Sequence, residues 1–203
     1  RLVPLSWQQR NAVKEIHALL LSAGFGTRLG PLTRDCPKCL MPIGQRPLLE
    51  HWLCTLFTHR ISKVLINIHH HRDLVESFLT RRQFKSWVFG IYEPELLGTA
   101  RTLCENQQFF TAKTTLLVHA DNWCHCDFGK FLEFHHAHRP VRTLITMMTF
   151  SAEDPKSCGI VETNDIGVVI NFHEKVLNPP SNKANAAVYL IEPEVVRMPG
   201  STL

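Results

Sequence analysis

Short apolar segments alternate with amphipathic segments along most of this sequence, and this alternation restricts the fold more than any other feature. The apolar segments, which have the length of strands, are residues 16–21, 62–68, 86–92, 114–120 and 141–150. A helical period of apolar positions occurs instead in residues 47–59, 72–82 and 129–139. This order predicts an α/β fold with a Rossmann-like mixed, mostly parallel sheet flanked by helices.

The pattern changes after residue 150. Strand-like pieces of a few residues, separated by Asn, Asp, Gly and Pro, occupy residues 159–162, 168–172 and 187–191. We expect them to be short β additions in the C-terminal third of the chain. The 203 residues, 44% of them apolar, suffice for one core, so we predict a single domain over residues 1–203, with residues 1–15 as an N-terminal extension. The first residue is not Met and the end, MPGSTL, adds no closing element, so we expect a fragment.

The composition argues against several classes of protein. Seven cysteines in a chain with an ordinary core predict reduced thiols and a cytoplasmic location rather than a disulfide framework. No apolar run approaches the roughly 20 residues of a membrane span, and the first residues do not resemble a signal peptide. The net charge of +4 is mild and the basic residues are scattered, so neither a membrane nor a nucleic acid is a predicted partner.

A segment rich in glycine, proline and basic residues directly follows the first predicted strand. Gly24, Gly26 and Gly30 would lie at the carboxyl end of the sheet, where open α/β folds bind their ligands. Glycines in such a turn let backbone N–H groups converge on phosphate oxygens, and Arg28 and Lys38 add full positive charges. The segment therefore predicts a phosphate-binding loop.

The glycine spacing argues against two common phosphate-binding motifs. It reads G-x-G-x-x-x-G, one residue longer than the dinucleotide fingerprint G-x-G-x-x-G, and it lacks the G-K-[ST] ending of a P-loop. An NAD-binding domain is therefore disfavoured.

The pattern G-x-G-T-R-L-x-P-L-T at residues 24–33, followed by P-K-x-L-x-P-I at residues 37–43, resembles the sugar-1-phosphate nucleotidyltransferases. The likeness is greatest to members of the mannose-1-phosphate guanylyltransferase type. Further segments resemble the family in the same order, at residues 93–100, 119–122, 172–175 and 182–189. The resemblance implies a Mg²⁺-dependent enzyme of nucleotide-sugar biosynthesis. It would join an NTP to a sugar 1-phosphate, giving an NDP-sugar and pyrophosphate.

The resemblance also implies roles for individual residues. Arg28 would stabilise negative charge on the leaving pyrophosphate, Lys38 would bridge phosphate oxygens, and Asp121 would hold Mg²⁺. The implied nucleotide-binding residues are Ser22, Ala23, Gly24, Gly26, Thr27, Glu93, Gly98 and Thr99. The implied sugar-phosphate-binding residues are Gly159, Glu174, Lys175 and Asn185. Lys175 would hold the sugar phosphate, and Glu174 would accept hydrogen bonds from sugar hydroxyls. The oligomeric state is left open, a homo-oligomer included.

The base is only partly indicated. Glu93, followed by Leu97-Gly98-Thr99-Ala100, favours GTP, because a carboxylate can accept from both N1–H and the 2-amino group of guanine. Some uridylyltransferases of the family also carry Glu at this place, so UTP stays open. The sugar is not readable beyond the likeness to mannose-1-phosphate enzymes.

Two departures from the family pattern keep a second interpretation open. Ala186-Ala187 stands where the family usually has a glycine after Asn185, and a methyl group could narrow the sugar site. Many relatives also place another metal-binding aspartate beyond the end of this chain. The alternative is a catalytically weak homologue that binds an NDP-sugar and regulates a partner enzyme.

Some other patterns favour ordinary structure over chemistry. Cys36 and Cys39 have C-x-x-C spacing, but no second pair exists and the motif lies inside the predicted phosphate loop. Zinc binding by Cys124 and Cys126 with His135, His136 and His138 is a weaker alternative to a loop and a helix surface. The histidines at 69–71 are expected to cap the next helix. Trp123 suits either the sugar pocket or the core.

Overall fold

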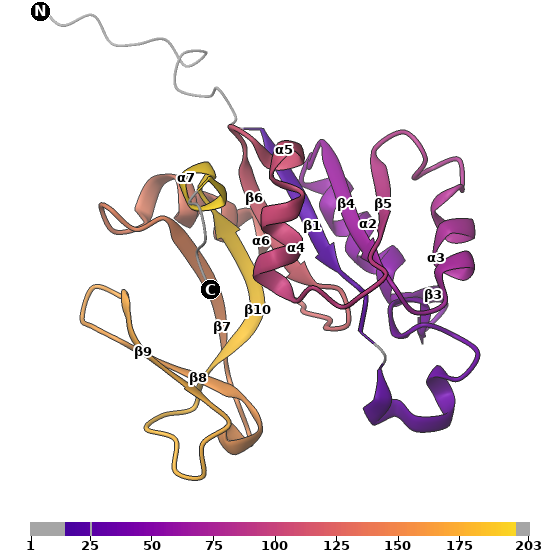
Figure 1. Cartoon of the computed structure of the whole chain (residues 1–203). Helices are drawn as coiled ribbons and strands as arrows, with labels where there is room; N and C mark the ends of the chain where they lie inside the picture. Colours follow the sequence, from indigo (N-terminus) through magenta and orange to yellow (C-terminus); the bar gives the residue numbers. More distant parts are fainter. Residues whose placement is uncertain (1–14, 25, 198–203) are drawn as a thin grey trace, which may run out of the picture.

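The computed structural model describes residues 15–24 and 26–197, without the side chains of Thr27 and Arg28. Its main element is an eight-stranded sheet with the order β5-β4-β1-β6-β10-β8-β9, in which β7 also pairs with β10 (Figure 1). The strands are β1 (Ile16–Leu21), β4 (Lys63–Ile68), β5 (Val88–Tyr92), β6 (Thr114–His119), β7 (Ile145–Ser151), β8 (Gly159–Thr163), β9 (Val169–Glu174) and β10 (Lys183–Ile191). A separate two-stranded hairpin joins β2 (Pro42–Ile43) to β3 (Arg46–Pro47).

Strands β5, β4, β1 and β6 form the parallel half of the sheet. Leu19 of β1 lies between Leu65 of β4 and Leu117 of β6, so the carboxyl ends of these strands share one edge. All three leucines are buried. Strands β1, β4 and β6 are covered on both faces and are near-continuous apolar runs, which made them recognisable in the sequence. Strand β5 lies at the edge of the sheet and is mostly exposed. The predicted Rossmann-like, mostly parallel sheet is confirmed.

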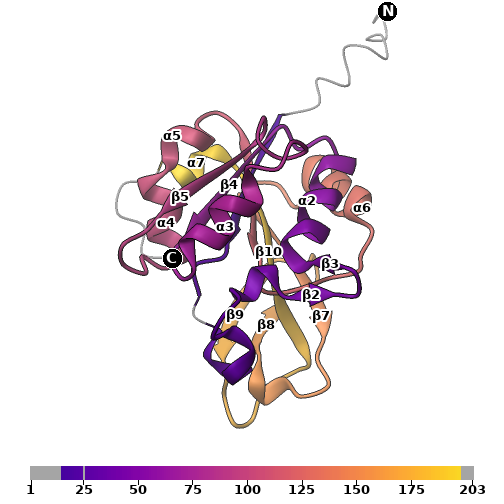
Figure 2. The same ribbon diagram turned by 90° about the vertical axis from the view of Figure 1, so that its right-hand side faces the viewer.

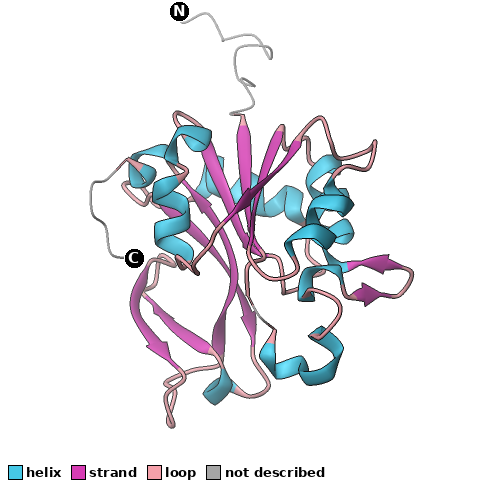
Figure 3. Cartoon of the chain, turned by 45° about the vertical axis from the view of Figure 1, so that its right-hand side comes forward, coloured by secondary structure: helices cyan, strands magenta, loops and turns pink. Residues whose placement is uncertain are grey.

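Helices cover both faces of this half (Figure 3). They are α2 (Leu48–Thr58), α3 (Arg72–Leu79), α4 (Thr99–Glu105), α5 (Gln107–Phe110), α6 (Phe128–Glu133) and α7 (Pro193–Val196), with a π-helical turn η3 (Phe134–His138) and 3₁₀ turns η1 (Thr27–Thr33), η2 (Lys38–Leu40) and η4 (Pro155–Ser157). One core cluster joins Leu20 to α2, α3 and α6, and the other joins Leu19 to α4, α5 and α7. Figure 2 shows α2 and α6 on one side of the sheet and α4, α5 and α7 on the other. Within the described part of the chain, every helix is too short or too polar to cross a membrane.

Strand β10 connects the parallel half to the C-terminal third. It pairs antiparallel with β6 through residues 188–191, with β7 along both of its ends, and with β8 at Ala184. Strands β8 and β9 form an antiparallel hairpin, and together with the ends of β7 and β10 they make an arm that extends away from the core (Figure 1). The predicted β additions in the C-terminal third are confirmed.

Several boundaries differ from the predicted ones. Strand β7 begins at Ile145 rather than at residue 141, because Thr143 closes a turn onto the Pro140 carbonyl. Strand β10 begins at Lys183 rather than at residue 187, since its early residues pair with β7 in the arm. The sequence pattern indicated neither α4 nor α5. His71 takes the N-cap position of α3, but its side chain contacts the Thr33 carbonyl and does not cap the helix.

Candidate active site

The first part of the site is the chain immediately after β1. The backbone N–H of Ser22 donates to Oδ1 of Asn67 at 2.7 Å, and its hydroxyl donates to the Asn67 carbonyl at 2.6 Å. These bonds join the carboxyl ends of β1 and β4. Beside them lies a cavity of about 210 Å³, whose lining includes most of the predicted nucleotide-binding residues together with Lys38 and Asp121. The lining residues are Leu21, Ser22, Ala23, Gly24, Lys38, Cys39, Asn67, Glu93, Leu96, Gly98, Thr99, His119 and Asp121.

Gly26 shapes the loop and does not line this cavity. Its φ of 64° lies in the left-handed region, and a Cβ there would lie 2.9 Å from Cγ2 of Thr33. The Thr33 hydroxyl donates to the Gly26 carbonyl at 3.3 Å and to the Gly30 carbonyl at 3.1 Å, which closes the loop on itself. The side chains of Thr27 and Arg28 lie outside the described residues, so the roles predicted for them stay predictions.

Lys38 and Asp121, predicted separately, are brought together. Nζ of Lys38 lies 2.8 Å from Oδ2 of Asp121, and the two side chains are 26% and 38% exposed. Lys38 comes from η2, whereas Asp121 lies two residues beyond β6. A cation and a carboxylate that face a cavity and remain partly hydrated can exchange partners when a charged ligand enters.

Glu93 is a buried structural group as well as a lining residue. Its side chain is 3% exposed; Oε1 accepts from the Thr102 hydroxyl at 2.6 Å, and Oε2 accepts from the Asn67 amide at 3.1 Å. The carboxylate therefore ties the end of β5 to β4 and to α4. The prediction treated Glu93 as an acceptor for guanine alone and missed Asn67 and Thr102, which no motif marks.

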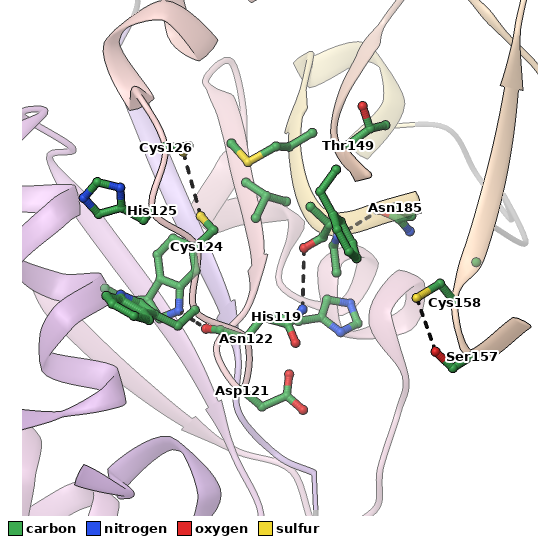
Figure 4. A pocket seen from close by; sticks show the side chains of 18 of the residues that line it. His119, Asp121, Asn122, Cys124, His125, Cys126, Thr149, Ser157, Cys158 and Asn185 are labelled. Atoms are coloured by element: carbon green, nitrogen blue, oxygen red, sulfur yellow. Dashed lines mark hydrogen bonds between the residues drawn. The ribbon is translucent and has the colours of Figure 1, made fainter. Parts of the chain in front are cut away.

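The second part of the site is a larger cavity of about 750 Å³ between the core and the arm (Figure 4). Of the predicted sugar-phosphate residues, Gly159, Lys175 and Asn185 line it. Glu174 is not among its lining residues; its side chain is 59% exposed and lies 3.1 Å from Nζ of Lys175. Glu174 is nevertheless adjacent, because a Cβ on Gly159 would lie 2.9 Å from its Oε2.

The Ala186-Ala187 segment lies in a β-bulge at the wall of this cavity. The side chain of Asn185 holds the bulge: Oδ1 accepts from the Ala187 N–H at 2.8 Å, and Nδ2 donates to the Tyr189 hydroxyl at 2.5 Å. Ala187 has a φ of 55°, a left-handed conformation that glycine adopts without strain. The departure from the family pattern therefore falls on a residue whose backbone favours glycine.

The segment after Asp121 is fixed to α2 and to β10. Trp52 donates from its indole N–H to the Asn122 carbonyl at 2.7 Å, and the Asn122 amide reaches the Ala186 carbonyl at 3.5 Å. Trp52, which is 2% exposed, belongs to the core. Trp123 is 56% exposed and lines the large cavity, so the core interpretation is wrong and a role in a sugar pocket stays a prediction.

Two residues, His119 and Asp121, line both cavities. His119 is the last residue of β6, and its Nε2 lies 3.5 Å from the Thr99 hydroxyl. Burial lowers the pKa of His119, against the opposing charge of Asp121, so its imidazole is neutral at neutral pH. Sequence reasoning did not select His119. The available signal was a polar residue ending an apolar strand two positions before the predicted metal ligand.

The zinc interpretation of the cysteines and histidines is wrong for the described residues. Sγ of Cys124 lies 3.8 Å from Sγ of Cys126, but among the described residues no histidine completes a group of three with metal-ligand spacing around them. The described group with metal-ligand spacing is instead His135, His136 and Glu192. There Nη1 of Arg139 lies 2.7 Å from Oε1 of Glu192 and 3.0 Å from Nε2 of His135, so a cation already occupies the position a metal would take.

The C-x-x-C pair is likewise not a redox pair. Cys39 is 1% exposed, and burial raises its pKa to about 12. All seven cysteines are free thiols, as predicted from their number.

An open, mostly parallel sheet with two adjoining cavities at the carboxyl ends of its strands has the arrangement in which open α/β proteins bind ligands. Comparison makes this more specific: a family model described as nucleotidyl transferase matches residues 17–201, and the chain belongs to this family.

The relatives include, by their names, both a uridylyltransferase and a guanylyltransferase. A UTP–glucose-1-phosphate uridylyltransferase from Synechocystis is 31% identical over 193 residues, covering 88% of this chain and 50% of that protein. The mannose-1-phosphate guanylyltransferase catalytic subunit beta of Drosophila melanogaster is 31% identical over 183 residues, covering 88% of this chain and 49% of that protein. The chain thus spans about half the length of these curated relatives.

Solved structures share the fold. A candidate glucose-1-phosphate thymidylyltransferase from Bacillus anthracis superposes with a TM-score of 0.79 at 24% identity, covering 89% of this chain and 73% of that one. A UDP-glucose pyrophosphorylase from Acinetobacter baumanii gives a TM-score of 0.75 at 16% identity, with coverages of 93% and 78%. At these identities the likeness concerns the fold alone.

Proposed function

We propose that this chain carries the site of a sugar-1-phosphate nucleotidyltransferase, which joins an NTP to a sugar 1-phosphate and releases pyrophosphate. The observation that supports this most directly is the meeting of two cavities at His119 and Asp121. Residues predicted for the nucleotide line one cavity, and residues predicted for the sugar phosphate line the other. Two substrates bound in this way would meet where the cavities join.

The proposed reaction needs positioning and charge neutralisation more than covalent help from the protein. An oxygen of the sugar phosphate attacks the α-phosphorus of the NTP in line, a new P–O bond forms, and the bond to pyrophosphate breaks on the far side. Negative charge grows on the leaving group, so fixed cations near it lower the barrier. Lys38 would supply one such charge from the cavity wall, and Arg28 would supply another.

Mg²⁺ is part of the proposal, and the donor set suits it. This ion commonly takes one or two protein carboxylates and completes its shell with phosphate oxygens and water. Asp121 offers a partly exposed carboxylate to both cavities. When bound, the ion would neutralise phosphate charge; Asp121 would hold it, and Lys38 would pair with phosphate oxygens.

More specifically, we propose that the two substrates are GTP and a mannose-1-phosphate-like sugar. The segment 93–100 favours it, and so do the relatives named as mannose-1-phosphate guanylyltransferases. The Synechocystis relative is 31% identical as well, so UTP with glucose-1-phosphate is the competing pair. Because both Glu93 oxygens accept internal bonds, a contact with guanine would have to use their remaining lone pairs.

The test measures pyrophosphate release with Mg²⁺ for four NTPs against mannose-, glucose- and N-acetylglucosamine-1-phosphate, alongside calorimetric binding of each NTP and NDP-sugar. We expect turnover, highest with GTP and mannose-1-phosphate. Highest turnover with UTP and glucose-1-phosphate would overturn the finer proposal. NDP-sugar binding without turnover would favour the regulatory homologue, and failure to bind any nucleotide would contradict the whole proposal.

A further inference from the structure

His119 occupies a position that the predicted chemistry leaves without a role. It ends β6 beside the end of β1, in register with Leu21, and lines both cavities. The other lining residue that the cavities share is Asp121, which the proposed reaction assigns to the metal. Figure 4 shows the His119 ring directed into the large cavity, near Asp121.

The position of His119 limits which part of a ligand it can contact. An NDP-sugar laid across the two cavities places its nucleoside in one and its sugar in the other. The atoms that cross the junction are those of the phosphate bridge, and they are the same for every base and every sugar. A side chain at the junction therefore faces the common part of the ligand, whereas residues deeper in either cavity face the variable parts.

The hydrogen bonding of His119 suits a phosphate oxygen. An imidazole carries at least one N–H donor in either protonation state. Nε2 lies 3.5 Å from the Thr99 hydroxyl, and when this nitrogen accepts from that hydroxyl the proton is on Nδ1. The described residues offer no other hydrogen-bond partner to this ring. Nδ1–H is then available for an incoming acceptor.

Resting on the function proposed above, we infer that His119 donates a hydrogen bond from Nδ1 to the phosphate bridge between the nucleoside and the sugar. It is a binding residue for the shared part of both substrates and does not select the base or the sugar. Its loss should weaken the NTP, the sugar 1-phosphate and the NDP-sugar together.

Three replacements of His119 separate the hydrogen bond from the shape of the side chain. His119→Leu keeps the approximate volume and removes both nitrogens. His119→Asn puts an amide N–H at about the place of Nδ1, and His119→Gln extends one toward the place of Nε2. A hydrogen bond to a charged group is worth roughly a ten- to hundredfold change in affinity. We expect His119→Leu to weaken NDP-sugar binding by about that factor, and His119→Asn to restore more of it than His119→Gln.

Matched controls come from residues that line one cavity only and are well exposed, so that they should fold normally. Leu96→Ala alters the small cavity, and Trp123→Ala alters the large one. We expect Leu96→Ala to raise the KM for the NTP alone and Trp123→Ala the KM for the sugar phosphate alone. His119→Leu should raise both KM values, and circular dichroism should show all variants folded.

The outcomes separate this inference from the proposed function. If wild-type protein binds neither NTP nor NDP-sugar, the proposed function fails and this inference fails with it. If wild type binds both and His119→Leu binds equally well, or loses affinity for one substrate only, His119 does not hold the bridge. If His119→Leu changed only the Mg²⁺ concentration needed for half-maximal activity, the inference would likewise be overturned, because His119 would then act through the metal.

Discussion

At the scale of single residues, the site depends on charges that are paired but still hydrated. The Lys38–Asp121 pair illustrates this: at 26% and 38% exposure, such a pair contributes about 0–1 kcal/mol to stability. Asp121 of this pair lines both cavities, and the proposed function assigns it to ligand binding rather than to folding. This distinction can be tested, because stability and activity should respond very differently to the same substitution.

We predict that Asp121→Asn abolishes Mg²⁺-dependent turnover while lowering the free energy of unfolding by no more than about 1 kcal/mol. Pyrophosphate release over a Mg²⁺ titration, together with urea unfolding, measures both quantities. Glu76→Gln is the control: it removes an exposed ion pair with Arg72, neither residue lines either cavity, and neither quantity should change by much. A large loss of stability in Asp121→Asn with activity retained would show that the pair is structural.

A second prediction concerns the left-handed residue in the bulge. Ala187→Gly should stabilise the protein by roughly 0.5–1 kcal/mol, because glycine removes the Cβ strain at a φ of 55°. Ala186 has no such φ, so Ala186→Gly should destabilise the protein by a similar amount. Thermal unfolding of both variants measures the difference. If Ala187→Gly and Ala186→Gly lowered the thermal stability equally, the backbone of Ala187 would not be strained.

At the scale of elements, buried polar groups join segments that the hydrophobic core alone would not hold in register. Glu93 ties β5 to β4 and α4. His135, fully buried, lies 2.8 Å from the Thr146 hydroxyl of β7 and 2.9 Å from Glu192, which precedes α7. Buried polar groups are costly unless they are fully hydrogen-bonded, so each network specifies one arrangement of its elements.

Glu93→Gln should lower the free energy of unfolding by about 1–3 kcal/mol, with or without ligand. The amide NH₂ would face either Asn67 or Thr102, both of which now donate to the carboxylate. Thr102→Val, which removes one donor from the same network, is the matched comparison and should also destabilise. Urea unfolding tests both. If Glu93→Gln left the free energy of unfolding unchanged but altered which NTP the protein prefers, Glu93 would act on the nucleotide alone.

The His135 network predicts a loss of stability in mild acid. Burial, together with the charge of Arg139, lowers the pKa of His135 from 6.5 to about 4, against the opposing effect of Glu192. The unfolded chain therefore binds more protons than the folded chain between these values. Stability attributable to His135 is present above pH 6.5 and is lost as the pH falls toward 4, by up to about 1.4 kcal/mol per pH unit.

The measurement is the free energy of unfolding from pH 8 to pH 4.5 for wild type and His135→Gln. We expect a shallower dependence below pH 6.5 in the variant. His138→Gln changes an exposed histidine on the same π-helical turn and should follow the wild-type curve. Parallel curves for wild type and His135→Gln would show that His135 is not the titrating group.

At the scale of the whole molecule, β10 brings the arm to the core. It pairs with β6 at one end, with β8 near the other and with β7 at both, so Asn185–Ala187 lie close to Asn122 across a large separation in sequence. The large cavity exists because of this crossing, whereas the small cavity belongs to the parallel half alone. A ligand that spans both should therefore affect both halves of the molecule.

We predict that an NDP-sugar protects backbone amides from hydrogen exchange in two regions together: the chain after β1, and the arm near Gly159 and Asn185. NTP alone should protect mainly the first region, because its predicted lining residues lie there. Hydrogen exchange followed by mass spectrometry measures this protection. Sugar 1-phosphate alone is the complementary control and should protect mainly the arm. Protection confined to one region by the NDP-sugar would contradict binding across the two cavities.

The sequence by itself determined the features that depend on contiguous residues. The apolar runs of β1, β4 and β6 predicted the parallel half, because strands buried on both faces must be apolar at successive positions. The glycines after β1 predicted a loop at the carboxyl edge, since they permit backbone conformations that other residues resist. Most of the residues that the family motifs indicated line one or both of the two cavities.

Tertiary structure decided the features that depend on segments far apart in the chain. The partners of Glu93, the burial of His135 beside Glu192 and the left-handed backbone of Ala187 follow no local period. His119 became notable only when two cavities were seen to share it. The physical reason is that burial and hydrogen-bond pairing depend on which distant groups the packed sheet brings together, whereas strand and turn preferences are properties of neighbouring residues.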